Sequence, residues 1–267
     1  MRLSIEHETH YAFEAPAQHS VQYLRLTPRP DPCQRIIDWQ VSTPGNLAPW
    51  VDGFDNVGHI SVLEGAHQEI GVTVRGVVET WSSNGVVPDD DGISPHIFLR
   101  ETSFTAVTPE IRDFAATFAA PLEAEGPLAG MHALMAGISD TVAYESGVTS
   151  VDTDAAHALA ARKGVCQDHA HLFIACAHAL GVPARYVSGY LLAGQNNDSH
   201  LASHAWAEAH VGGLGWVSFD PTNRQSATDA YVRLAIANDY LGASPIRGVR
   251  EGGGTESLNV RVHVAEQ

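Results

Sequence analysis

A run of eight residues decides how this chain folds: Gly164-Val165-Cys166-Gln167-Asp168-His169-Ala170-His171. From Cys166 onward, apolar residues recur at helical spacing until a Gly-Val-Pro sequence at 181–183, and they are Ala170, Phe173, Ala177 and Leu180. This pattern predicts a buried helix that begins at Cys166. Unpaired N–H groups and the positive end of the helix dipole favour thiolate over thiol at a helix start, which makes Cys166 a candidate nucleophile. Cys176, in the middle of the same helix, is typical of a buried structural cysteine.

Two downstream residues are candidate partners of this thiol. His204 begins a strand-like run at 205–211, and Asp220 ends another at 215–219. If the two strands are antiparallel and joined at Gly212-Gly213, the chain turns back and brings Asp220 close to His204. The carboxylate would then set the tautomer of the imidazole and stabilise imidazolium. Spacing alone leaves open an ordinary strand-end histidine and a turn aspartate.

The rest of the chain predicts an α+β protein with two domains. Residues 1–105 contain short alternating strands separated by turns, which is typical of an antiparallel β-sandwich-like domain. Residues 106–267 begin with helices, one starting at Thr108 and others over 127–144 and 152–162. Strands follow at 184–192, 205–211, 215–219 and 257–264, so we expect the Cys166 helix to pack on an antiparallel sheet.

Composition limits the possible partners and location. The formal charge is -16, with a short acidic cluster at residues 89–91, and a nucleic-acid backbone would be repelled. No apolar run is long enough to span a membrane, and the N-terminus alternates where a signal peptide would be continuously apolar. Three cysteines, none in a CxxC pair, favour a reduced, cytoplasmic setting. The oligomeric state cannot be predicted.

Metal binding is the rival chemistry. His200 and His204 lie close in the sequence, and Cys166, His169 and His171 offer further possible ligands. No second paired set occurs at the spacing of a zinc site, so we expect no metal and no cofactor.

Three blocks in this order resemble the bacterial transglutaminase-like superfamily: residues 164–172, 203–206 and 216–222. The segment around Tyr11, Pro16 and 24–28 is similar to the β-rich N-terminal region found with this domain in bacterial members. The resemblance covers nearly the whole chain. It implies a papain-like core with a catalytic triad of Cys166 as nucleophile, His204 as acid and base, and Asp220 as orienting group.

The resemblance also implies acyl transfer on a peptide or carboxamide through a thioester. Hydrolysis is favoured over amine cross-linking, because water is always available and no amine site is recognisable. A catalytically silent peptide- or protein-binding module is the alternative. The backbone N–H of Cys166 is one candidate oxyanion donor. Tyr144, Gln167 and Asp168 are candidate auxiliary residues: Tyr144 as a side-chain oxyanion donor, and Asp168 as a brace of the helix start. His171 is expected to make a buried hydrogen bond.

Overall fold

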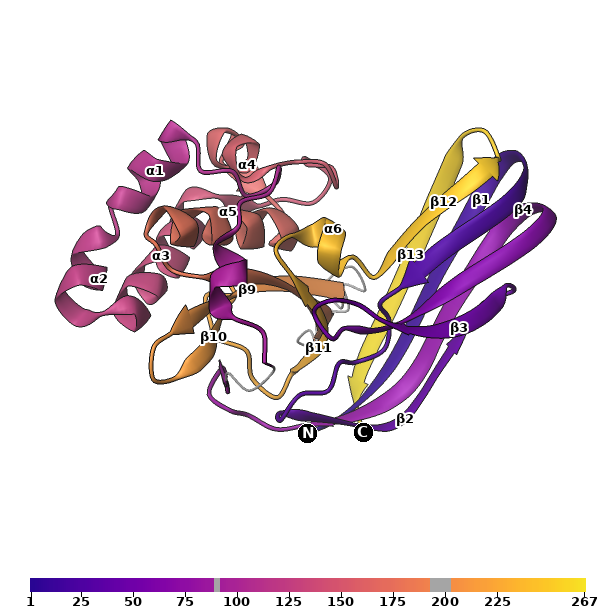
Figure 1. Ribbon diagram of the computed structural model, residues 1–267, viewed down its shortest axis with the longest axis horizontal. Coiled ribbons are helices and arrows are strands. Elements are labelled where there is room, and N and C mark those ends of the chain that lie inside the picture. Colours follow the sequence, from indigo (N-terminus) through magenta and orange to yellow (C-terminus); the bar gives the residue numbers. More distant parts are fainter. Residues whose placement is uncertain (89–91, 193–202) are drawn as a thin grey trace.

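The computed structural model describes residues 1–88, 92–192 and 203–267. It confirms the α+β class, with a six-stranded and a five-stranded antiparallel sheet and a group of helices. Figure 1 shows the helices gathered over the five-stranded sheet, while the long strands of the other sheet stand to one side. The acidic cluster at 89–91 and most of the loop at 194–203 lie outside the described residues.

Two long strands, β1 (Arg2–Leu24) and β4 (Val57–Thr80), form the centre of the six-stranded sheet. Their pairing is interrupted between Ala12 and Ala17, which divides the sheet into two halves. β2 (Gln34–Ser42) extends one half and β3 (Asn46–Val51) extends the other. One hydrophobic cluster joins Val72 from the first half to Leu24 from the second, so both halves share a core.

The C-terminal end of the chain returns to this sheet. β12 (Ile246–Gly252) and β13 (Glu256–Glu266) both pair with β1. The expected strand at 257–264 is therefore confirmed, but its partner is the N-terminal strand. The expected segment 106–267 thus contributes two strands to the sheet begun by the first segment, and the division at residue 105 remains a prediction.

The five-stranded sheet has the order β11-β8-β9-β10-β5, and its neighbouring strands pair antiparallel. Its strands are β5 (Val86–Val87), β8 (Ala184–Leu191), β9 (Ser203–Val211), β10 (Gly215–Phe219) and β11 (Tyr231–Ala237). The helix α5 (Cys166–Ala179) packs on β8 and β9, as expected. Its residues 168–177 are all buried, because helices cover its other sides.

The surrounding helices are α1 (Pro109–Ala116), α2 (Ala119–Glu125), α3 (Pro127–Thr141), α4 (Ala155–Ala161) and the short α6 (Tyr240–Ala243), with a 3-10 turn η1 (Pro95–Leu99). Thr108 caps α1 as predicted, because its hydroxyl accepts from the N–H of Ile111. The predicted helix to Tyr144 is wrong at its end. α3 stops at Thr141, and Tyr144 lies in β6 (Ala143–Tyr144), which pairs in parallel with β7 (Lys163–Gly164).

Two side-chain amides attach the N-terminal segment to the edge strand β11. Gln34 accepts from the N–H of Arg233 and donates to its carbonyl oxygen, at 2.9 and 2.8 Å. Asn56 makes the same pair of bonds with Ile236, at 2.8 and 2.7 Å. Each amide takes the place of the peptide group of a neighbouring strand. The backbone N–H and carbonyl groups of Arg233 and Ile236 therefore remain hydrogen-bonded although they are buried.

Candidate active site

His204 and Asp220 meet at the ends of two neighbouring strands. β9 and β10 pair as an antiparallel hairpin, with Phe219 opposite Ala207. Nε2 of His204 is 2.7 Å from Oδ2 of Asp220, and the two side chains are only 2% and 0% exposed. The close approach expected from a turn at Gly212-Gly213 is present.

Asp220 is surrounded by hydrogen-bond donors. Its Oδ2 also accepts from the amide of Asn223 at 2.7 Å and the hydroxyl of Tyr231 at 2.8 Å. Its Oδ1 accepts from the N–H groups of Thr222 and Asn223 at 3.0 and 3.2 Å. Burial raises the pKa of a carboxyl group, but the hydrogen bond and charge of His204, with the other donors, hold the pKa of Asp220 below its usual value. The carboxylate is therefore ionised at neutral pH.

Cys166 lies close enough to His204 to act on the pKa of its ring. Burial lowers its pKa, but hydrogen bonds to Asp220 and Cys166 and the negative charges on both outweigh burial and raise the pKa of His204 to about 10. Because Nε2 faces Asp220, Nδ1 is the ring nitrogen that remains for the sulfur. These surroundings therefore favour the imidazolium form of His204 beside the Asp220 carboxylate.

The half-buried Cys166 is the first residue of α5. Asp168 braces this helix start, because its Oδ2 accepts from the N–H of Val165 at 2.8 Å and from the hydroxyl of Thr149 at 2.7 Å. A Cβ on Gly164 would lie 2.7 Å from Cβ of Asp168, so the brace requires glycine there. The Gln167 amide donates to the carbonyl of Val151 at 3.1 Å.

His169 connects the start of β6 to the turn that holds Asp220. Its Nε2 donates to the carbonyl of Val142 at 3.0 Å, so its Nδ1 accepts from the hydroxyl of Thr222 at 2.9 Å. Burial lowers the pKa of His169, which agrees with this neutral tautomer. The ring of Tyr144 lies 6.4 Å from that of His169, and strand pairing places Tyr144 beside Gly164, close in sequence to Cys166.

His171 makes the expected buried hydrogen bond. Its Nε2 accepts from the N–H of Tyr240 at 3.1 Å, and its ring stacks on Phe104 with centroids 5.0 Å apart. Burial lowers its pKa to about 3, so the ring is neutral at physiological pH.

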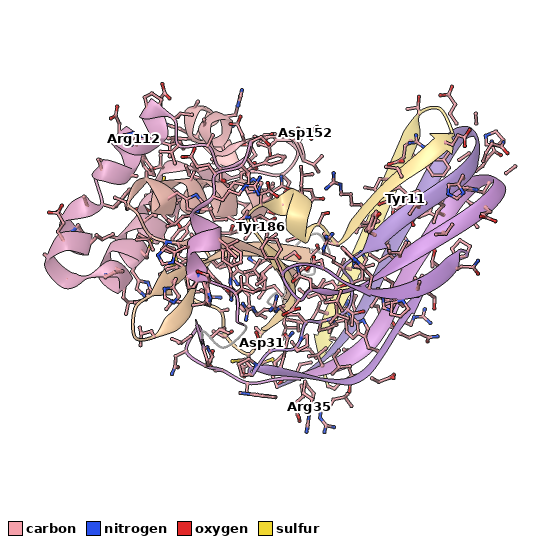
Figure 2. All side chains as sticks on the ribbon, viewed as in Figure 1. Tyr11, Asp31, Arg35, Arg112, Asp152 and Tyr186 are labelled. Carbon is pink, nitrogen blue, oxygen red and sulfur yellow. The ribbon has the colours of Figure 1, made fainter. Side chains whose placement is uncertain are left out.

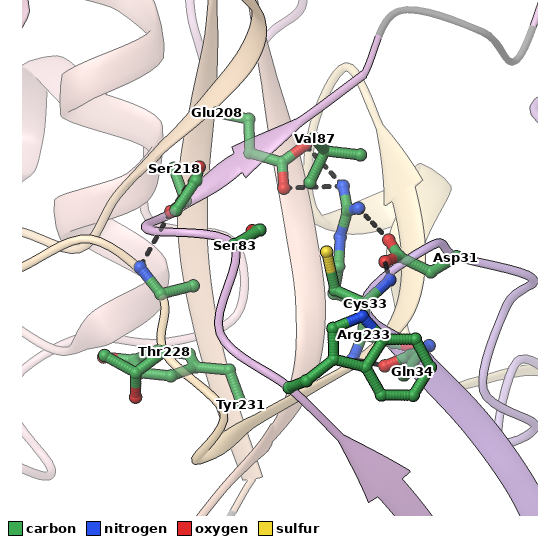
Figure 3. Close-up of a pocket in the computed structure, with 13 residues that line it drawn as sticks. Asp31, Cys33, Gln34, Ser83, Val87, Glu208, Ser218, Thr228, Tyr231 and Arg233 are labelled. Carbon is green, nitrogen blue, oxygen red and sulfur yellow. Dashed lines mark hydrogen bonds and ion pairs between the residues drawn. The ribbon is translucent and has the colours of Figure 1, made fainter.

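The other two cysteines have different surroundings. Cys176 is buried, and burial raises its pKa strongly. Cys33 lines a cavity of about 30 Å³ beside Arg233, which forms ion pairs with Asp31 and Glu208 (Figure 3). Burial also raises the pKa of the Cys33 thiol. A cavity of this size holds about one water molecule, so it offers no room for a peptide.

The rival metal site is only partly covered by the structure. Among the described residues, His, Cys, Asp and Glu side chains form no group of three or more arranged to hold a metal ion. His200 lies outside the described residues. In the part of the chain that is described, no helix is both long and apolar enough to cross a membrane.

Two contacts of Asp220 were not predicted from the sequence. Asn223 lies in the turn after β10 and Tyr231 at the start of β11, and neither belongs to a motif. A weak local signal exists for Asn223, because an aspartate in a turn often accepts from backbone N–H groups that follow it, as Asp220 does here.

Comparison with known proteins identifies the family. Residues 114–221 match the transglutaminase-like superfamily, and residues 3–79 match the bacterial transglutaminase-like N-terminal region. An uncharacterized protein of Mycobacterium leprae is 31% identical, with 98% of each chain covered. One of Mycobacterium bovis is 29% identical, covering 93% of this chain and 87% of its own. The chain belongs to the transglutaminase-like superfamily.

A solved structure shares the same fold. A candidate cysteine protease from Cytophaga hutchinsonii superimposes with a TM-score of 0.77 at 22% identity, covering 99% of this chain and 90% of that one. At this identity the likeness concerns the fold alone.

Proposed function

We propose that this protein is a cysteine-dependent acyl-transfer enzyme that acts on peptide or carboxamide bonds. One observation carries the proposal: a buried His204 is hydrogen-bonded to the ionised Asp220, and Cys166 lies close enough to raise the pKa of the same imidazole. A base that is held in place by an acidic group activates a neighbouring thiol as a nucleophile. A structural role would not require the thiol to lie at a half-buried helix start beside an imidazolium.

In the proposed reaction, the thiolate of Cys166 adds to the carbonyl carbon of the substrate. His204 gives its proton to the leaving amine, and the thioester of Cys166 remains. His204 then takes a proton from water, which attacks the thioester and releases the acid and free thiolate. Asp220 keeps the imidazole in place through both steps. The backbone N–H of Cys166, at the start of α5, is the proposed main-chain donor to the oxyanion.

Tyr144 is the proposed side-chain oxyanion donor, supported by its position beside Gly164. Gln167 and Asp168 form hydrogen bonds with nearby backbone groups. These bonds favour a role in holding the helix start in place, without contact with the reacting atoms. If Tyr144 donates to the oxyanion, Tyr144→Phe should lower kcat by about ten-fold or more while KM stays the same. Full turnover by Tyr144→Phe would remove this role.

Hydrolysis is proposed over cross-linking, because the thioester needs only water for hydrolysis. We also propose a cytoplasmic location, supported by three cysteines that are all free. Fractionation of cells with an antibody against the protein tests the location, and recovery outside the cytoplasm would overturn it.

A peptide library analysed by mass spectrometry tests the function. Wild type and Cys166→Ala are incubated with the same peptides, with and without an added primary amine. Peptides shortened, or heavier by 1 Da through deamidation, only with the wild type support hydrolysis; amine adducts support cross-linking. Identical libraries after both incubations would favour a silent binding module.

A further inference from the structure

A groove of about 170 Å³ lies between the six-stranded sheet and the α6 region. Tyr11 and Leu258 face each other across β1 and β13, as do Thr9 and Val260. Residues two apart on a strand share a face, so these four side chains form one wall. The remaining lining residues are His7, Ser203, Tyr240, Pro245 and Ile246. Figure 2 labels Tyr11, which lies on β1, and Tyr186, which lies on β8 of the five-stranded sheet across from it.

The groove borders the elements that carry the candidate active site at two places. Ser203, which lines it, directly precedes His204. Tyr240, which also lines it, has its ring 6.3 Å from that of Tyr186. Tyr186 lies near enough to Cys166 for the charge of that thiol to raise the Tyr186 pKa, after the larger effect of burial. The groove therefore lies next to the elements that carry the candidate active site.

The described residues that line the groove carry no formal charge at neutral pH. None of the described residues that line it is Asp, Glu, Lys or Arg. His7 is buried, with Nδ1 2.8 Å from the Tyr190 hydroxyl and Nε2 2.9 Å from that of Thr9, and burial lowers its pKa to about 4. Burial, with the nearby Glu256 and Tyr240, raises the pKa of Tyr11 to about 12. At neutral pH both rings are uncharged.

Apolar side chains in the groove remain open to solvent. Leu258 is 56% exposed and Val260 is 40% exposed. A ligand that covers them removes apolar surface from water, which is favourable, whereas a charged group would lose its hydration without a partner. A cavity of about 150 Å³ accommodates a benzene-sized molecule, so the groove has room for one side chain.

We propose that this groove is a specificity subsite for one apolar side chain, of leucine, methionine or phenylalanine size, of the peptide substrate. The inference rests on the proposed function in one respect, that the bound chain is a substrate. The binding itself does not depend on turnover.

Affinity selection tests the subsite without chemistry. Cys166→Ala, which cannot form a thioester, is equilibrated with randomised heptapeptides, and the retained peptides are identified by mass spectrometry. We expect Leu, Met or Phe at one position to be enriched about ten-fold over Ala, Asp and Glu, as the burial of one apolar side chain implies. Adding Val260→Trp fills the groove and should abolish this preference. Adding Asn259→Trp, at the neighbouring exposed position of β13 whose side chain points to the opposite face, should leave it unchanged.

A third variant keeps the test decisive if Val260→Trp does not fold. Leu258→Glu changes a mostly exposed side chain and should shift the preferred residue to Lys or Arg. The inference is overturned if peptides bind with no positional preference, or if the preference survives both changes in the groove. Because selection uses the Cys166→Ala protein, a wild type that binds these peptides but never converts them would refute the proposed function and leave the subsite intact.

Discussion

Replacing Asp220 by asparagine tests whether the buried carboxylate determines the tautomer of His204. Five donor atoms face the two carboxylate oxygens: from His204, Tyr231, Thr222 and two groups of Asn223. An amide offers only one acceptor oxygen. A backbone N–H group can only donate a hydrogen bond. The NH₂ group of the asparagine therefore cannot face the N–H groups of Thr222 and Asn223 without leaving donors opposed.

The amide must therefore turn its NH₂ group toward His204 and Tyr231. His204 then accepts at Nε2 and carries its proton on Nδ1, so it cannot take a proton from the thiol of Cys166. The same substitution in a serine protease triad lowers kcat on the order of 10⁴-fold, and we expect a loss of at least about 10³-fold here. Lost charge-assisted hydrogen bonds should also lower the free energy of unfolding by about 1 to 3 kcal/mol.

The assay compares steady-state turnover of a converted library peptide and urea denaturation for Asp220→Asn and Asp113→Asn. Asp113 is an exposed residue of α1, so the control makes the same chemical change at the surface. The control should match the wild type in both measurements. If folded Asp220→Asn retains more than about a tenth of wild-type turnover, the tautomer argument is wrong.

Three other predictions concern the surroundings of the site. The NMR signals of the His204 ring should show imidazolium up to pH about 10, and a titration near 6.5 would contradict the ion-pair arrangement. Native His171 stays neutral down to pH about 3, while the same residue in the unfolded chain takes up a proton below about 6.5. The free energy of unfolding therefore decreases as the pH is lowered through this window, by about 1.4 kcal/mol per pH unit. His171→Gln should therefore flatten the dependence of unfolding free energy on pH between about 4 and 6, and equal slopes would refute this. Asn56→Ala should lower the free energy of unfolding by about 2 kcal/mol or more, because Ile236 loses both partners; a urea midpoint within error of wild type would show that the edge finds other partners.

Local patterns predicted the part of the site that depends on local structure. Helical spacing after Cys166 and two alternating runs joined at Gly212-Gly213 are short-range features, and the helix and the hairpin follow them. Because the hairpin fixes its own register, the nearness of His204 and Asp220 could be predicted as well.

Contacts between distant segments could not be predicted in this way. Nothing in the alternation of residues 257–264 shows that β13 pairs with β1 rather than with a nearer strand. The amide of Asn56 bonds to Ile236, and Tyr231 bonds to Asp220, only because the tertiary fold places these segments side by side. Tyr144 was expected at a helix end because apolar spacing continues to Val142, yet the helix stops when the chain pairs with Gly164.

Competitive alkylation of the three cysteines tests the central claim most directly. Native protein is treated at neutral pH with a trace of iodoacetamide, and the labelled fraction of each cysteine is measured by mass spectrometry. Cys33 is an internal control, because it is also half-buried but its pKa is raised by burial. We predict that Cys166 is labelled at least about ten-fold faster than Cys33, and that His204→Ala removes the difference. Labelling of Cys166 no faster than Cys33 in the wild type would contradict its role as an activated nucleophile.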